Sequence, residues 1–251
     1  MQLNLVIDLS TIVAAPFVGS FLGVAIRRIP NGRPIVLARS ACESCGRTLE
    51  FRDLIPLVSW LALRGKCRSC GSSLSAFYPA VELAALGIAI WSLAVLPGWI
   101  AWAGIGLGWT LLVLACIDQR TMLLPDVLTL PLGVSGLVIA WLIDPTLLPD
   151  HVIGAVAGYV AFTALAWLYR RFRGYDGLGS GDAKLVGALG AWLGWQGLPT
   201  LVLYGALSGL LYAIASSVPK RQLALADRLP FGPHLCLGGW LVWLYGPLAL
   251  G

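Results

Sequence analysis

Charged residues are scarce in this chain. Asp, Glu, Lys and Arg make up 12% of the 251 residues, whereas hydrophobic residues make up 58% and the mean hydropathy is +0.83. Soluble domains contain roughly 25% charged residues. The scarcity of charge excludes an ordinary soluble protein and predicts an all-α protein that crosses a membrane several times.

Three further absences narrow the possibilities. No basic residue precedes the first apolar run, and Asp8 lies inside that run, so we expect this segment to stay as a helix rather than be cleaved as a signal peptide. Only two histidines occur, His151 and His234, and neither has a partner near in sequence, which argues against a histidine-based metal site or triad. No G-x-G-x-x-G follows a strand, so the common dinucleotide-like cofactor pocket is not expected.

Long apolar runs predict about eight transmembrane helices. Most of them reach the roughly 17–25 residues that a span requires. Between the sixth and seventh runs we predict a break at Gly197-Leu198-Pro199, because Gly and Pro disrupt helices, although one long helix over 185–218 is an alternative. The runs cover residues 3–26, 79–96, 98–116, 123–143, 151–169, 185–197, 200–217 and 234–250.

The basic residues decide between eight spans and seven. All 17 Lys and Arg fall in 27–68, at 120, in 170–184 or in 220–228. With eight spans and an external N-terminus, every one of them is cytoplasmic, whereas seven spans would move the last group outside. The positive-inside rule therefore favours eight. The net charge of +5 reflects this bias and attraction to anionic lipid headgroups, so nothing calls for a nucleic-acid partner.

A polar insert, residues 27–78, interrupts the apolar pattern. It carries nine basic and three acidic residues and two C-x-x-C pairs separated by 21 residues, each followed by glycine. This spacing is typical of a Cys₄ zinc ribbon, in which each pair directs two thiolates at one structural zinc ion. The alternative, redox-active or unpaired thiols, is less favoured because the cytoplasm disfavours disulfides. The predicted zinc ligands are Cys42, Cys45, Cys67 and Cys70.

The insert divides the chain into three predicted parts. Residues 1–26 form the first transmembrane helix, 27–78 form a cytoplasmic zinc-binding domain, and 79–251 form a transmembrane domain. An insert of about 50 residues is too small for a large core, so a metal ion would help to hold it together. The other two cysteines, Cys116 and Cys236, lie in predicted helices and are interpreted as packing residues.

Two aspartates at the ends of apolar runs are the candidate catalytic residues. Asp118 ends the third run, and Asp182 closes the segment Gly179-Ser-Gly-Asp182 before the sixth. A charged side chain at membrane depth costs ~2.5–3.5 kcal/mol, so it indicates function. The predicted topology puts both carboxylates at the cytoplasmic ends of their spans. Two carboxylates about 3 Å apart share one proton, as in an aspartyl-protease dyad.

Each acidic residue also has a structural interpretation. Asp182 would serve as a helix N-cap, and Asp118 as an interfacial residue paired with Arg120. Asp126 follows Pro125, where a carboxylate suits the start of a helix dipole, and substrate positioning is the alternative. Glu82 is assigned to the first turn of the second span, again as a partner of the dipole.

The remaining candidates lie in loops. Gly179 and Gly181 suit a backbone that turns sharply and lets an extended substrate approach. Asp176 and Asp227 fall in the same cytoplasmic loops and are candidates for contact with basic groups of a substrate, or are simply solvated.

Taken together, these segments resemble the type IV prepilin peptidases. No single block is specific, but they follow the order of that family from residue 19 to residue 233. One departure is Gly23, where the family pattern suggests Asn. The blocks are Gly19-Ser-Phe-Leu22, Arg28-Ile-Pro30, the two cysteine knuckles within 40–46 and 64–71, Leu54-Ile-Pro-Leu-Val-Ser-Trp60, Tyr78-Pro-Ala-Val-Glu82, Asp118 with Leu124-Pro-Asp126, Gly179-Ser-Gly-Asp182 and Pro230-Phe-Gly-Pro233.

The resemblance implies a bifunctional enzyme of the bacterial inner membrane. Such an enzyme cleaves the short basic leader of prepilins or pseudopilins after a glycine, on the cytoplasmic side. It then N-methylates the new N-terminal residue with S-adenosylmethionine. The family's catalytic aspartates map onto Asp118 and Asp182, whereas no residues are assigned here to the methyl donor.

Two other functions are compatible with parts of the pattern. A membrane scaffold whose zinc ribbon docks a cytoplasmic partner would need the cysteines but not the aspartates. A G-x-G-D protease of another substrate class, such as a signal-peptide or preflagellin peptidase, would need the aspartates but not the Cys₄ insert.

Overall fold

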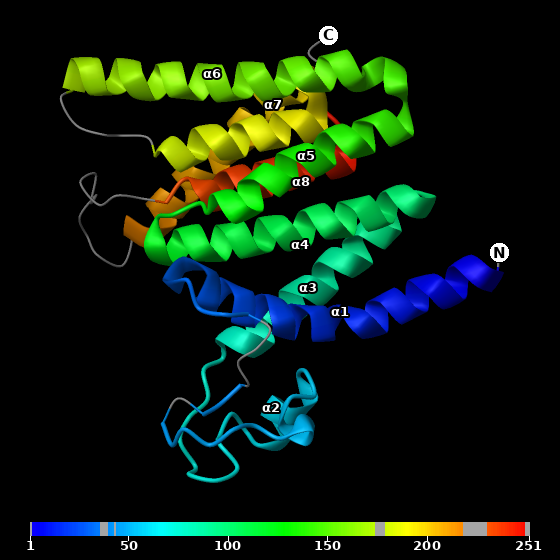
Figure 1. The fold of residues 1–251 in the computed structure, drawn as a ribbon, viewed down its shortest axis with the longest axis vertical. Helices are drawn as coiled ribbons and strands as arrows, with labels where there is room; N and C mark the ends of the chain where they lie inside the picture. Colours follow the sequence, from blue (N-terminus) through cyan, green and yellow to red (C-terminus); the bar gives the residue numbers. More distant parts are fainter. Residues whose placement is uncertain (1, 36–39, 43, 174–178, 218–229, 249–251) are drawn as a thin grey trace. The chain divides into compact units, whose positions relative to one another are not determined.

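The computed structural model describes residues 2–35, 40–42, 44–173, 179–217 and 230–248. Within these residues helices dominate, and the only β pairing consists of two isolated bridges. The chain separates into two compact units, residues 1–109 and 110–251, and the boundary falls within the helix Gly98–Thr121, which Figure 1 labels α4. The predicted all-α class is confirmed. The helices are α1 Gln2–Arg28, α2 Val58–Ala62, α3 Phe77–Val95, α4 Gly98–Thr121, α5 Asp126–Ile143, α6 Leu148–Arg173, α7 Ser180–Ser217 and α8 Gly232–Tyr245, with 3₁₀ turns at Ile29–Asn31, Phe51–Asp53 and Pro145–Leu147.

Six of these helices are long and apolar enough to cross a membrane, within the described part of the chain. They are α1, α3, α4, α5, α6 and α7. Because α7 consists of two helices joined at a kink, it supplies two segments, and α8 supplies another apolar one. The predicted number of eight helical segments is therefore confirmed, and the protein is a multi-pass membrane protein.

The break inside α7 lies at Gly194, not at Gly197-Leu198-Pro199 as predicted. Gly194 has φ 69° and ψ 172°, a conformation that essentially only glycine adopts. Gly197 is helical, and the Leu193 side chain packs closely against it, since a Cβ on Gly197 would lie 2.7 Å from that side chain. The chain therefore turns at Gly194, whose φ is positive, and not at Gly197, which stands two residues before Pro199.

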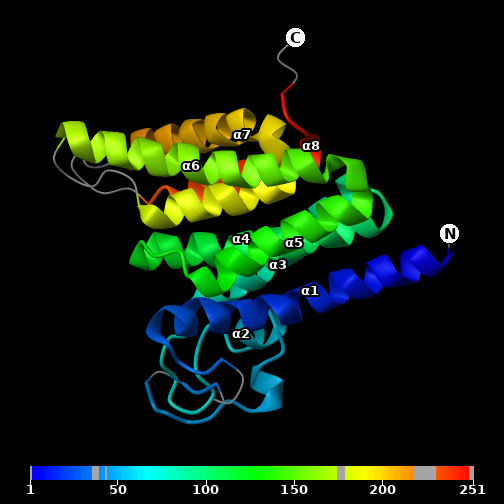
Figure 2. The same ribbon diagram turned by 45° about the horizontal axis from the view of Figure 1, so that its top comes forward.

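The chain reverses direction at this break. In the first half of α7, Leu189 packs on Gly239 and Trp192 on Trp243, so this half runs parallel to α8. In the second half the pairing is antiparallel, because Gly205 approaches Leu235 and Gly197 approaches Val242. The two halves of α7 therefore run in opposite directions, as Figure 2 shows for its yellow and orange segments.

The first half of α7 is the centre of the second unit. It is buried on nearly all sides, against α5, α6 and α8. Its contact with α6 depends on glycines: a Cβ on Gly154 would lie 2.5 Å from the Gly190 carbonyl oxygen, and one on Gly158 would lie 2.9 Å from that of Val186. Small residues allow this close approach of helix backbones, which is how membrane helices pack.

In the first unit, α1 and α3 pack along each other. A Cβ on Gly19 would lie 2.7 Å from the Glu82 Cα, and one on Gly23 would lie 2.9 Å from the Tyr78 ring. The departure from the family pattern at Gly23 therefore has a physical reason here, because the Tyr78 ring fills the space that a side chain would need.

Candidate active site

Asp182 is held at the start of α7 by the backbone of Gly179. It is the third residue of the helix, and its Oδ2 accepts a hydrogen bond from the Gly179 amide at 3.2 Å. This is the reach-back bond that an acidic residue makes to the N-cap amide. Asp182 is therefore not the N-cap itself, contrary to the structural alternative above. Only 8% of its surface is exposed.

Asp118 lies near the end of α4, with 5% of its surface exposed. Its Oδ2 accepts a hydrogen bond from the Gly232 amide at 3.0 Å. A Cβ at position 232 would lie 2.6 Å from that same oxygen, so any side chain there would displace the carboxylate or α8. Asp118 is thus a buried carboxylate that accepts a hydrogen bond from a backbone donor 114 residues away.

Gly232 is the functional residue that sequence reasoning missed. The block Pro230-Phe-Gly-Pro233 belongs to the family pattern, but nothing in its sequence indicates which residue contacts a carboxylate. Gly232 is the first residue of α8, where helix amides have no partner within the helix. An amide at this position is free to donate to an anion.

Asp118 and Asp182 belong to the same unit, and they lie close enough to each other and to the thiol of Cys236 for their charges to interact. Cys236 is buried and Cys116 half-buried, and both are free thiols. Asp118 and Asp182 are thus two buried carboxylates, and each accepts a hydrogen bond from one backbone amide.

Asp126 makes a contact that the sequence did not suggest. It is the first residue of α5, and its carboxylate forms an ion pair with Lys184 at 2.7 Å. Beside it, a Cβ on Gly181 would lie 3.0 Å from the Leu124 side chain. The beginnings of α5 and α7 are therefore joined next to Asp182. Asp176 and Asp227 lie outside the described residues.

The four cysteines of the insert form the second candidate site. Their sulfur atoms all lie within 4.8 Å of one another, and Cys42 Sγ is 3.9 Å from Cys70 Sγ. Tetrahedral Zn–S bonds of about 2.3 Å place two sulfurs about 3.8 Å apart. The amides of Cys45 and Ser44 lower the pKa of Cys42 to about 6, whereas the neighbouring thiols of Cys42 and Cys70 help to raise the pKa of Cys45 to about 11. The donor set and its spacing therefore fit a structural zinc ion.

The two knuckles have the same local structure. In the first, the Cys42 amide donates to Arg47 and the Gly46 amide donates back to Cys42. In the second, Cys67 and Gly71 make the equivalent bonds. Both glycines have φ near +70°, at 69° and 71°, so they turn the chain where other residues would be strained.

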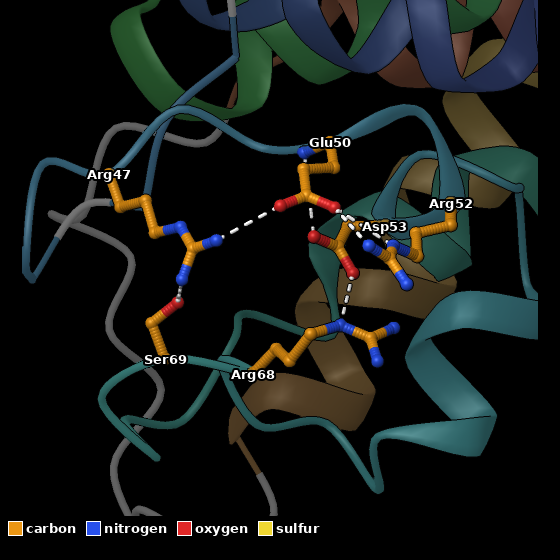
Figure 3. A network of polar contacts seen from close by, with 6 residues as sticks. All are labelled: Arg47, Glu50, Arg52, Asp53, Arg68 and Ser69. Atoms are coloured by element: carbon orange, nitrogen blue, oxygen red, sulfur yellow. Dashed lines mark hydrogen bonds and ion pairs between the residues drawn. The ribbon is translucent and has the colours of Figure 1, made fainter.

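A polar network joins the knuckles to each other and to the segment between them (Figure 3). Arg47 donates to Ser69 at 2.6 Å and to Glu50 at 2.9 Å. Arg68 pairs with Asp53 at 2.8 Å, and the Arg68 side chain is the main cause of the lowered pKa of Asp53. These bonds fix one cysteine pair relative to the other.

Glu82 does not occupy the predicted position. It lies in the second turn of α3 rather than the first, and 5% of its surface is exposed. Its Oε2 accepts a hydrogen bond from the amide of Leu57 in the insert at 2.8 Å. Glu82 therefore connects α3 to the insert and does not serve the helix dipole.

Comparisons with known proteins agree with this arrangement. Residues 13–96 match the bacterial peptidase A24 N-terminal domain, and residues 105–214 match the type IV leader peptidase family. The chain is 39% identical over 255 residues to the prepilin leader peptidase/N-methyltransferase of Aeromonas salmonicida, covering 91% of this chain and 87% of that one.

Two further relatives with the same name are similar over most of their length. The Burkholderia pseudomallei protein is 38% identical over 261 residues, covering 94% of this chain and 84% of that one. The Pseudomonas aeruginosa protein is 36% identical over 270 residues, covering 95% and 90%. No solved structure matches the chain. The chain therefore belongs to the type IV leader peptidase family.

Proposed function

We propose that the chain is a membrane aspartyl endopeptidase that removes the basic leader of type IV prepilins or pseudopilins after a glycine. The observation that carries this proposal is the pair of buried carboxylates, Asp118 and Asp182, each held by the backbone amide of a glycine. The names of the relatives support prepilins as the substrate class.

In the proposed reaction the dyad shares one proton. The ionised carboxylate takes a proton from a water molecule, whose oxygen attacks the carbonyl carbon of the scissile peptide bond. The protonated carboxylate gives its proton to the carbonyl oxygen. When the tetrahedral intermediate collapses, the C–N bond breaks, the amine takes up a proton, and the new carboxyl group is released with the leader. The Gly179 and Gly232 amides hold the two carboxylates in place throughout.

The basic residues around the dyad support a cut on the cytoplasmic side. Arg120 near the end of α4, Arg170 and Arg171 near the end of α6, and Lys184 at the start of α7 belong to the helix ends at which the dyad lies. Basic residues gather on the cytoplasmic side of a bacterial inner membrane. The leader of the substrate, which is itself basic, lies on that side before export.

The second proposed activity is N-methylation of the newly exposed N-terminus, supported by the names of the relatives. Bound S-adenosylmethionine supplies an activated methyl group on a sulfonium. The acceptor would be the newly exposed N-terminal amine of the substrate, which must lose its proton before it can take the methyl group. The Cys₄ site would hold a structural zinc ion that keeps the insert folded.

The test is leader removal by the purified enzyme in detergent, followed by the mass of the prepilin. We compare the wild type with Asp118→Asn, Asp182→Asn and the matched control Asp144→Asn, whose carboxylate instead caps the short turn after α5. We expect cleavage by the wild type and the control and none by the dyad variants. Cleavage by both folded dyad variants would refute the dyad, and addition of one methyl group with S-adenosylmethionine would support the second activity.

A further inference from the structure

The insert carries large apolar side chains that are exposed on and beside α2. Phe51, Val58 and Leu61 have 83%, 60% and 66% of their surface exposed, and the exposed Leu54 lies between them in sequence. Val58 and Leu61 are three residues apart in one helix, so they share a face, and the 3₁₀ turn Phe51–Asp53 contacts α2. Single exposed apolar residues are ordinary, but a cluster marks a surface that something covers. We call these four residues the apolar surface of the insert.

The opposite face of α2 is directed at the helices of the first unit. Trp60 and, just after the helix, Leu63 line a cavity together with Tyr78 of α3. Trp60 Nε1 also donates to the Leu74 carbonyl at 3.4 Å, which holds this face against the chain that leads into α3. Within the described residues, α2 therefore packs one apolar face on its own unit and leaves the other exposed.

A hydrogen bond fixes the depth of α2 relative to α3. The 19 residues of α3 form a helix about 28 Å long, close to the roughly 30 Å of a hydrocarbon core, so its first turns lie at the membrane boundary. Glu82 is the sixth residue of α3, about 8 Å from its start, and its side chain tilts towards that start. Its Oε2 accepts the bond from the Leu57 amide at 2.8 Å. Leu57, immediately before α2, is therefore level with the first two turns of α3.

Residues typical of a membrane boundary lie at the same level. The Arg27 guanidinium is 4.8 Å from the centre of the Tyr78 ring and 5.2 Å from that of Phe77. Aromatic and basic residues gather where a membrane meets water. Figure 2 shows the insert beside the C-terminal half of α1 rather than beyond its end, and the wall of the shared cavity includes Ser20 as well as Arg27. The apolar surface of the insert is therefore at the depth of the lipid headgroups and not in bulk water.

The charges around the apolar surface indicate what covers it. Arg64 and Lys66 follow α2, both are exposed, and neither forms an ion pair within the described residues. Arg52, next to Phe51, is paired with Glu50. Basic residues beside an apolar surface attract anionic headgroups, and they repel the basic leader of a prepilin. Lipid is therefore favoured over the substrate as the partner of this surface.

We propose that the apolar surface of the insert docks in the headgroup layer of an anionic bilayer. Phe51, Val58 and Leu61 reach the boundary of the acyl chains, and Arg64 and Lys66 lie at the phosphates. Buried apolar area and attraction to anionic lipid are the two sources of binding at a membrane interface. The insert is thereby held from two sides, by the Glu82 carboxylate on its inner side and by lipid on its outer side.

The test is photo-crosslinking of the full-length enzyme in nanodiscs that contain equal amounts of phosphatidylglycerol and phosphatidylcholine. The photoreactive p-benzoylphenylalanine replaces Leu61 in one variant and Phe51 in another, and peptide mass spectrometry identifies what each position has captured. We expect phospholipid adducts at both positions. The matched control places the same residue at Thr48, which is exposed in a stretch, 44–50, that has no exposed large apolar side chain, and it should capture no lipid.

The lipid composition of the adducts tests the basic residues separately. At position 61, phosphatidylglycerol should be enriched over phosphatidylcholine by about fivefold for each basic residue that faces the headgroups. The double substitution Arg64→Gln and Lys66→Gln should remove this enrichment, and enrichment that survives it would overturn the role of these two residues. Leader removal by each variant shows that it is folded.

Three results would overturn the docking surface itself. The first is an absence of lipid adducts at positions 51 and 61 in folded enzyme. The second is capture at Thr48 that equals capture at position 61. The third is capture, at position 61, of an added prepilin or of a second copy of the chain in place of lipid, which would make the surface a protein interface.

Discussion

Glycine amides, rather than other side chains, position both carboxylates of the candidate dyad. Gly179 donates to Asp182 from just before α7, and Gly232 donates to Asp118 from the start of α8. An amide has a fixed place in the backbone, so each carboxylate is oriented without a flexible partner. Hydrogen bonds from amides to a carboxylate are charge-assisted and therefore stronger than neutral ones.

Gly232→Ala should abolish most of the peptidase activity while leaving the protein folded. The added Cβ would sit 2.6 Å from Asp118 Oδ2, so either the carboxylate or α8 must shift. A displacement of about 1 Å at reacting groups costs ~100-fold in rate. The measurement is kcat/KM for leader removal, alongside the thermal unfolding temperature in detergent.

Gly87→Ala is the matched control for this substitution. A Cβ on this helical glycine would meet nothing within 4 Å, so its activity should equal that of the wild type. If Gly232→Ala cleaved as fast as Gly87→Ala, the amide of Gly232 would not matter for the reaction.

Among the elements, α7 determines the architecture of the second unit. Its first half carries Asp182 and forms the buried centre, and its reversal at Gly194 returns the second half to the side of α8. Without this reversal, a helix of 38 residues would be about 57 Å long, well beyond a hydrocarbon core of about 30 Å.

Gly194→Ala should therefore destabilise the protein. At φ 69° and ψ 172° an alanine is strained by about 1–3 kcal/mol, and its Cβ would also lie 2.9 Å from Gln196 Oε1. We expect a lower thermal unfolding temperature in detergent than for Gly209→Ala. Gly209 is a helical glycine of the same element whose Cβ would make ordinary contacts at 3.5 Å. Equal unfolding temperatures would show that the turn tolerates a side chain.

At the scale of the whole molecule, the chain combines two units with different means of stabilisation. The second unit is held by close helix packing through glycines, as at Gly154 and Gly190. The insert of the first unit has few buried apolar residues and depends on its cysteines and its polar network instead. Domains with so small a core are often stabilised by a bound metal ion.

The purified protein should contain one zinc ion per chain. In Cys67→Ser the ion should be lost, because one of four ligands is removed, and the insert should become sensitive to protease within residues 40–75. Metal content is measured by mass spectrometry and the cut sites by peptide mapping. Cys116→Ser, which alters a cysteine outside the cluster, should keep its zinc. A zinc-free wild type with a protease-resistant insert would exclude the structural metal.

The sequence alone was sufficient for the features that depend on local composition and spacing. The number of apolar segments follows from runs of apolar residues. Each cysteine knuckle follows from one C-x-x-C spacing, and each aspartate is recognised by its place at the end of an apolar run. All three patterns are local. The packing of those segments is not local in this sense. Nothing near Asp126 in sequence indicated its ion pair with Lys184, 58 residues away.

Only the tertiary structure decided which backbone groups meet the acidic side chains. The partner of Asp118 is an amide, and every residue except proline has one, so no residue type could identify Gly232 in advance. The same holds for Glu82, whose partner is the amide of Leu57. The position of the break was also not local, because several glycines could have turned the chain. The structure has the break at Gly194, and Gly197 lies in the helix beside Leu193 and Val242. Sequence therefore determined which chemical groups the protein has, and the packing of distant segments determined what each group contacts.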